Sequence, residues 1–325
     1  MKEAVFLQEV KEIQLLKNAL TLLDWDSSTG MPEKSSPFRG EVEGYLTGLY
    51  FERSIGPVIQ EALAYFETRP EELSELGKLV FEKVKEEYAL NKNVPAERMQ
   101  EYVKVLNQAH TDWLKARAAQ DFGLLEETLT KVVAFQKEFI PYWQKEEKTP
   151  YDVLLNQFEP GMTVEKLDQV FDQVKQGIQE IRTVLAEKGT PPRTDFLSRK
   201  MTKEQQRRFV IGVVEQLGYD FSKGRLDDTV HPFMTALNRN DARITTRWEE
   251  NNFSMATFGV IHEAGHGMYE QNFDPKFDFT PLSEGASMGI HESQSLFNEI
   301  IIGSNRAFWQ KQYPFFQECA EGTFD

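Results

Sequence analysis

The chain reads SMATFGVIHEAGHGMYEQ from Ser254 to Gln271. Its central string, HEAGH at 262 to 266, separates two histidines by one helical turn, so both imidazoles lie on the same face of a helix. The flanking residues can continue this helix despite the glycines that they contain. We therefore predict a helix over this stretch, with His262 and His266 as ligands of one metal ion.

A second helix is predicted from Gly285 to Gly303, where the chain reads GASMGIHESQSLFNEIIIG. A catalytic zinc needs three protein ligands and one open position, and two histidines with a carboxylate are a known set. Glu292 lies at the centre of this second helix and can face the first helix across a short loop. We predict Glu292 as the third ligand, with Glu299 and Glu284 as the competing candidates.

Glu263 directly follows the first histidine, so its side chain is offset around the helix from the predicted ligands. It can therefore hold the water that the metal binds rather than the metal itself. Zinc lowers the pKa of such a water to about 7, after which a carboxylate takes the proton and the hydroxide attacks a polarised carbonyl. We predict Glu263 as the general base, the alternative being a solvated surface glutamate.

Four of the five histidines lie between residues 231 and 291, and only His110 stands apart. Upstream of the predicted metal ligands lie two further strings, HPF at 231 to 233 and DARIT at 241 to 245. From the residues alone both are ambiguous. His231 can be a core histidine bonded to the backbone, and Arg243 can form a structural ion pair with Asp241.

Helical periodicity extends over most of the chain. Thr163 and Gly189 are the predicted N-cap and end of one helix, Thr202 begins another with a capping box and Gly218 ends it, and a third covers about Glu3 to Leu23. The clearest apolar stripe, with i, i+3/i+4 spacing, consists of Leu167, Val170, Phe171, Val174, Ile178, Ile181 and Leu185.

Period-2 alternation, which is typical of strands, is scarce and is best developed from Arg243 to Trp248. Breaks between periodic segments are predicted at Gly30 to Pro37, Thr149 to Gly161 and Gly189 to Thr194, where Pro, Gly and Ser gather. None of them has the composition of a flexible interdomain linker. The economical prediction is a mainly α-helical single domain over residues 1–325.

Composition narrows the class of protein. The 325 residues carry a formal charge of −15 with scattered Lys and Arg, which disfavours nucleic acid as a partner. The single cysteine, Cys319, forms no internal disulfide, and the first twenty residues lack the apolar core of a signal peptide. No apolar run is long enough to span a bilayer. We expect a cytoplasmic protein without a membrane partner.

Taken together, these strings resemble the Taq-type metallocarboxypeptidases, zinc-dependent enzymes that remove residues from peptide C-termini. HPF, DARIT, HEAGH and HESQS at 291 to 295 stand in the order and spacing of that family. Weaker resemblance extends through LLDWDSSTGMP near the start, PYDVLLNQFEPG at 150 to 161 and LGYDFSKGRLD before the HPF string. The similarity therefore covers essentially the whole chain.

The resemblance implies an almost wholly helical fold with a deep substrate groove, similar to the thimet-type and angiotensin-converting-enzyme-like peptidases. It also implies a homodimer with one metal ion per chain and peptides as substrates. It assigns the same three metal ligands and the same base as the residues themselves. His231, Arg243 and His291 match motifs that the family places around the substrate groove.

The family pattern continues past HESQS into an I-R-x-x-A-D motif that this chain, ending at Asp325, does not contain. We therefore expect a domain without the family's C-terminal region. The resemblance implies that the arginine of the missing motif anchors the terminal carboxylate of the substrate. Helices that pack on that region should then expose apolar side chains, and the predicted ones are Phe308, Trp309, Phe315 and Phe316.

Two rival functions remain open at this point. A thimet-type metallo-endopeptidase or oligopeptidase uses the same H-E-x-x-H string with a distant glutamate, although HPF and DARIT favour the carboxypeptidase. The other rival is a metal-binding fragment with weak catalysis. The ion also stays open, because Co²⁺ or Mn²⁺ can replace Zn²⁺ at a site of two histidines and a carboxylate.

Overall fold

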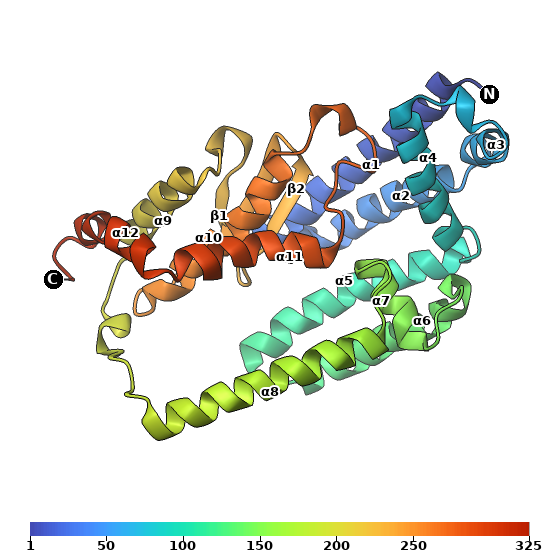
Figure 1. Ribbon diagram of the computed structural model, residues 1–325. Coiled ribbons are helices and arrows are strands. Elements are labelled where there is room, and N and C mark those ends of the chain that lie inside the picture. Colours follow the sequence, from blue (N-terminus) through green and yellow to red (C-terminus); the bar gives the residue numbers. More distant parts are fainter. Residues whose placement is uncertain (325) are drawn as a thin grey trace. The chain divides into compact units, whose positions relative to one another are not determined.

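The computed structural model describes residues 1–324, and it is mainly helical, as the sequence predicts (Figure 1). The chain divides into two compact units. The first comprises Met1–Val153 and the later segment Asp274–Glu284, and the second comprises Leu154–Phe273 and the described residues after Glu284. The predicted metal ligands all belong to the second unit.

The first unit is built from helices that surround an apolar core of residues such as Phe6, Phe66 and Phe81. Its first helix extends six residues past the predicted end at Leu23. The helices are α1 (Glu3–Thr29), α2 (Ser36–Ser54), α3 (Pro57–Phe66), α4 (Glu75–Asn91), α5 (Ala96–Ala119) and α6 (Gly123–Trp143).

The break predicted from Thr149 to Gly161 is wrong, because most of it is a helix, α7 (Pro150–Phe158). Proline at the first position of a helix starts it rather than ends it, since its missing N–H has no helical partner there. Thr149 and Asp152 reinforce this start. The Asp152 N–H donates to Thr149 Oγ1 at 3.1 Å, and the Thr149 N–H donates to Asp152 Oδ2 at 3.0 Å.

The second unit combines helices with one small sheet. The sheet has the order β1-β3-β2, in which β1 runs parallel and β2 antiparallel to β3. Its elements are α8 (Val164–Lys188), α9 (Lys203–Leu217), β1 (Leu226–Asp228), β2 (Met234–Asn238), β3 (Asp241–Thr246), α10 (Phe253–Gln271), α11 (Met288–Leu296), a π-helical segment (Phe297–Gly303) and α12 (Arg306–Cys319).

The predicted helix ends are confirmed where a cap defines them. The Thr163 hydroxyl accepts the Lys166 N–H at the start of α8, and Thr202 forms the predicted capping box with Gln205 at the start of α9. Gly218 ends α9 with φ at 114°, a conformation that favours glycine.

The prediction of an exposed aromatic face on α12 is wrong. Phe316 is buried, and its neighbours Phe308, Trp309 and Phe315 pack against the core of the second unit. The exposed apolar face belongs to α8, where no side chain within this fully described helix is buried. The periodic stripe of α8 therefore predicts the helix correctly, but the stripe itself is not buried in the structure.

Helix α10 forms the centre of the second unit (Figure 1). It contacts β2 and β3 on one side, and α9, α11 and the π-helical segment on others. Val260, Ile261 and Ala264 are fully buried there, together with Ile244 of β3 and Phe209 of α9. The helix that carries the HEAGH string is therefore fixed on several sides by packing.

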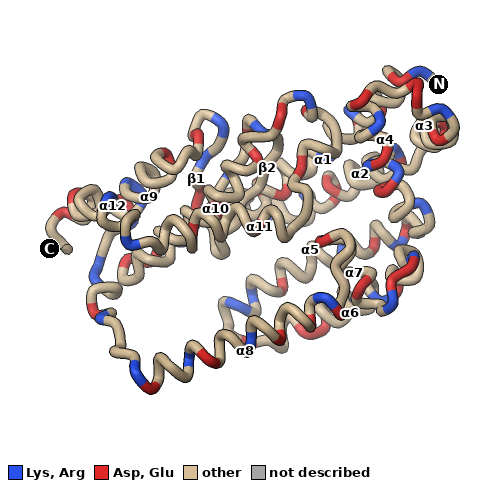
Figure 2. Tube along the Cα trace, viewed as in Figure 1, with Lys and Arg blue, Asp and Glu red and all other residues tan. Residues whose placement is uncertain are grey.

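Lys and Arg residues are interspersed with Asp and Glu along the helices rather than gathered in one region (Figure 2). This distribution agrees with the scatter seen in the sequence. In the part of the chain that the structure describes, no helix is both long and apolar enough to cross a membrane.

Candidate metal centre

Gly265 decides how closely the two helices of the site approach. A Cβ atom at this position would lie 2.7 Å from both the Gln294 carbonyl oxygen and the Ser295 Cα atom of α11. Such a distance is far shorter than a normal contact, so only glycine allows α11 to pack here. The glycine weakens the helix intrinsically, and in return the backbones of α10 and α11 come together.

The start of α11 is held by a residue that lies far away in the sequence. Ser287 is the N-cap, and its hydroxyl accepts the Ile290 N–H at 3.2 Å. The Glu159 carboxylate accepts both the Gly289 N–H at 2.8 Å and the Ser287 hydroxyl at 3.0 Å. A carboxylate at a helix N-terminus satisfies free N–H groups and complements the helix dipole, so Glu159 fixes the helix that carries Glu292.

The packing of α10 against α11 brings three predicted ligands together. His262 Nε2 lies 3.8 Å from Glu292 Oε1, and His266 Nε2 lies 3.4 Å from Glu292 Oε2. One donor atom from each residue lies within 4.8 Å of the others, and these residues are the one such group of three among residues 1–324. The carboxylate is exposed, whereas the imidazoles are partly buried.

Each of the two imidazoles has its other nitrogen occupied by a protein group. His262 Nδ1 lies 2.8 Å from Glu299 Oε2. His266 Nδ1 lies 2.6 Å from His291 Nδ1, and His291 Nε2 in turn lies 2.9 Å from Glu270 Oε1. The Nε2 atoms are therefore the ones that face Glu292.

Glu263 lies beside these donors and is only 7% exposed. Burial is the main cause that raises the pKa of its carboxyl to about 7. His262 acts to lower this pKa, whereas Glu292 and Glu299 raise it. Burial also lowers the pKa of His266 to about 4, and the neighbouring His291 and His262 act in the same direction. His266 is thus neutral over the physiological range, the form in which imidazole binds a metal ion.

The donor set fits a divalent metal ion. Two neutral imidazole nitrogens and one carboxylate are the ligands of many catalytic zinc sites. In such sites the second nitrogen of each histidine is hydrogen-bonded to a carboxylate or another protein group, which is the arrangement seen here. His262, His266 and Glu292 are the residues that would hold the ion.

The competing candidates for the third ligand have other partners. Glu299 is bonded to His262 Nδ1, on the side of the ring away from Glu292. Glu284 belongs to the first unit and forms an ion pair with Lys17 there.

The HPF and DARIT strings lie on and beside the small sheet that packs against α10. The Thr245 hydroxyl accepts the Phe233 N–H at 2.8 Å, and the Thr245 N–H donates to the Phe233 carbonyl at 2.9 Å, so the two strings are joined. Arg243 forms the ion pair with Asp241 that the residues suggested, with two contacts of 2.8 Å. His231 is exposed, in the connection from β1 to β2.

Two carboxylates of this region were not predicted from the sequence. Glu270 lies one turn after His266 on α10, so the same i, i+4 spacing that identified the histidines could have indicated it. Glu159 could not have been found in this way, because it lies 130 residues before Gly289 and outside any local pattern.

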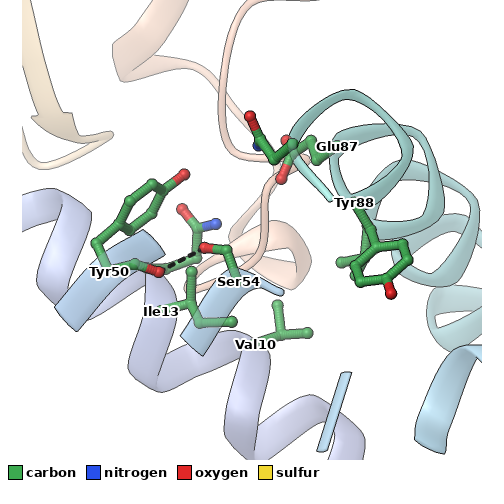
Figure 3. Close-up of a pocket in the computed structure, with 9 residues that line it drawn as sticks. Val10, Ile13, Tyr50, Ser54, Glu87 and Tyr88 are labelled. Atoms are coloured by element: carbon green, nitrogen blue, oxygen red, sulfur yellow. Dashed lines mark hydrogen bonds between the residues drawn. The ribbon is translucent and has the colours of Figure 1, made fainter. Parts of the chain in front are cut away.

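A small cavity, of about 50 Å³, lies in the first unit (Figure 3). Its apolar wall includes Val10 and Ile13, and its polar wall includes Tyr50 and Glu87. Ser54 borders it and donates its hydroxyl to the Tyr50 carbonyl at 2.7 Å. Burial raises the pKa of Glu87, while Lys17 opposes and Glu284 adds to this shift.

The mainly helical fold and the HEAGH string place the chain in the class of helical proteins that carry an H-E-x-x-H motif. The comparison with family models is more specific. The model of the family Carboxypeptidase Taq (M32) metallopeptidase matches residues 5–325, and the chain belongs to this family.

The relatives extend beyond the length of this chain. It is 42% identical to Carboxypeptidase 1 of Bacillus subtilis over 99% of this chain and 64% of that protein. It is 32% identical to Thermostable carboxypeptidase 1 of Thermus thermophilus over 94% of this chain and 62% of that protein. The crystal structure of an M32 carboxypeptidase from Deinococcus radiodurans matches with a TM-score of 0.88 at 32% identity. The match covers 98% of this chain and 63% of that chain.

Proposed function

We propose that the chain is a zinc-dependent metallocarboxypeptidase that hydrolyses the C-terminal peptide bond of peptides. The observation that carries the proposal is the convergence of His262, His266 and Glu292 within 4.8 Å in a member of this family. Relatives of the family are named carboxypeptidases, which supports exopeptidase rather than endopeptidase activity.

A divalent ion held by these three residues would act as a Lewis acid on the scissile carbonyl and lower the pKa of the attacking water. Glu263 is proposed to take one proton from this water as its oxygen bonds to the carbonyl carbon. It would return that proton to the amine nitrogen as the carbon–nitrogen bond breaks. The position of Glu263 directly after His262, buried beside the donors, supports this role.

His231 and Arg243 are proposed to contact the substrate, as the resemblance implies. The two strings are joined through Thr245, and the sheet that carries them packs against α10, the helix of the HEAGH string. Arg243 carries the positive charge that recognition of a terminal carboxylate requires, although Asp241 already engages it.

Zinc is proposed as the ion, at one per chain, with Co²⁺ or Mn²⁺ as substitutes. A homodimer is proposed from the resemblance alone. A cytoplasmic location is proposed because the single cysteine, Cys319, is buried and unpaired with any other cysteine.

The test uses one peptide in two forms, with a free C-terminal carboxylate and with a C-terminal amide. The zinc-loaded chain should release single residues from the acid and cleave the amide much more slowly. Internal fragments at equal rates from both forms would identify an endopeptidase. Zinc binding without any cleavage would identify the metal-binding fragment considered above.

A further inference from the structure

Neutral histidine exists in two forms that differ in which ring nitrogen carries the proton. Only the form protonated on Nδ1 leaves a lone pair on Nε2 for a metal ion. His262 Nε2 and His266 Nε2 are the atoms that face Glu292, so to bind an ion there both rings must carry their proton on Nδ1.

For His262 the neighbouring group decides this directly. Glu299 Oε2 lies 2.8 Å from Nδ1, and an ionised carboxylate can only accept a hydrogen bond. The proton of His262 is therefore held on Nδ1, and Nε2 stays free for the ion.

For His266 the same result is reached through a second imidazole. The buried Glu270 carboxylate can only accept, so His291 must carry its proton on Nε2, 2.9 Å away. His291 Nδ1 is then an acceptor, and it lies 2.6 Å from His266 Nδ1. The proton of His266 is thereby held on Nδ1.

The surroundings of His291 keep its ring in this orientation. The edge-to-face contact with Tyr269 has a ring separation of 5.2 Å. The backbone at Gly285 also packs closely against the ring, because a Cβ atom at this position would lie 2.5 Å from His291 Cδ2. Both ring nitrogens are already used inside the protein.

We propose that Glu299 and the pair His291–Glu270 are positioning residues, which fix the proton position and ring orientation of His262 and His266 for metal binding. This inference rests on the metal-binding part of the proposed function, and it goes beyond the ligands and the base. It gives His291 a role different from the substrate contact that the resemblance suggests.

The first experiment measures zinc affinity by competition with a chelating dye, without any peptide. His291→Phe removes the acceptor for His266, and we expect roughly 10- to 100-fold weaker binding. His291→Gln can still accept through its amide oxygen and should bind within a few-fold of the unchanged chain. His110→Phe is the matched control, because His110 is exposed on α5 and should leave the affinity unchanged.

Unchanged zinc affinity in a folded His291→Phe variant would overturn the proposal. If that variant does not fold, Glu270→Leu and Glu299→Leu decide, because leucine cannot accept a hydrogen bond, and each should weaken zinc binding. Unchanged affinity in both would also overturn it. Because no peptide is present, a chain that binds zinc but cleaves nothing refutes the proposed activity and leaves this inference intact.

The second experiment reads the protonated nitrogens directly, by ¹⁵N–¹H NMR of the imidazoles in the metal-free chain. We expect the proton on Nδ1 in His262 and His266 and on Nε2 in His291. In Glu299→Gln, His262 alone should become a mixture of the two forms. Protonation of His266 on Nε2 in the unchanged chain would overturn the relay through His291.

Discussion

The Glu159 carboxylate accepts the backbone N–H of Gly289 at 2.8 Å, although 130 residues separate them in the sequence. Gly289 lies in the first turn of α11, three residues before the predicted ligand Glu292. A Cβ atom at Gly289 would lie 2.5 Å from Glu159 Oε2, so the glycine gives the carboxylate room. The position of Glu292 therefore depends on a residue outside the helix pair.

Glu159→Gln should weaken both the fold and the metal site. The amide loses the charge that favours a helix N-terminus, and we expect a loss of about 1 kcal/mol in the free energy of unfolding. Zinc affinity should fall as well. Urea unfolding and dye competition measure the two effects, with Glu187→Gln on the exposed face of α8 as the control. Equal values for both variants would contradict the role of Glu159.

Gly265→Ala and Gly259→Ala test the close approach of α10 to α11. At Gly265 the added methyl group meets backbone atoms at 2.7 Å, so we expect a loss of about 1 to 3 kcal/mol in stability and weaker zinc binding. At Gly259 the nearest atom is 4.0 Å away, and the higher helix propensity of alanine should stabilise α10. The prediction fails if both variants change stability in the same direction.

Glu263→Gln separates metal binding from proton transfer. Loss of a general base typically lowers kcat by about 10² to 10⁴, and we expect a loss of this size with zinc still bound at one per chain. His266→Ala is the contrasting variant, which should lose the zinc. Near-normal kcat in Glu263→Gln would remove Glu263 from the mechanism.

Glu87→Gln should change how stability depends on pH. Burial raises the pKa of Glu87 in the folded chain above its ordinary value of 4.5, so the folded state binds this proton more tightly than the unfolded state. Stability from this group is therefore present below pH 4.5 and is lost as pH rises through the raised value. Glu87→Gln removes the titrating carboxyl, so the stability of this variant does not fall in this way as the pH rises.

Melting temperatures measured from pH 4 to pH 8 should accordingly diverge, with Glu87→Gln more stable than the unchanged chain at pH 8 and equal to it near pH 4. Glu82→Gln, on the exposed side of the same helix, controls for the loss of one negative charge. A difference that is largest at pH 4 would reverse the sign and refute the argument.

The sequence by itself determined the features that near neighbours control. The caps at Thr163 and Thr202, the end of α9 at Gly218 and the one-turn spacing of His262 and His266 depend on residues at most four positions away. Local hydrogen bonds and helical geometry are sufficient to specify them. The proline rule explains the error at α7, where a helix start was interpreted as a break.

Only the tertiary structure decided which carboxylate faces which histidine. Helix α10 packs against both α11 and the π-helical segment, so Glu299 of that segment reaches His262 while Glu270 of α10 reaches His291 of α11. The register of α10 and α11 is set by the close approach at Gly265 and by the bond from Glu159 to α11. Both depend on atoms that folding brings together from distant parts of the chain, and helical periodicity carries no information about them.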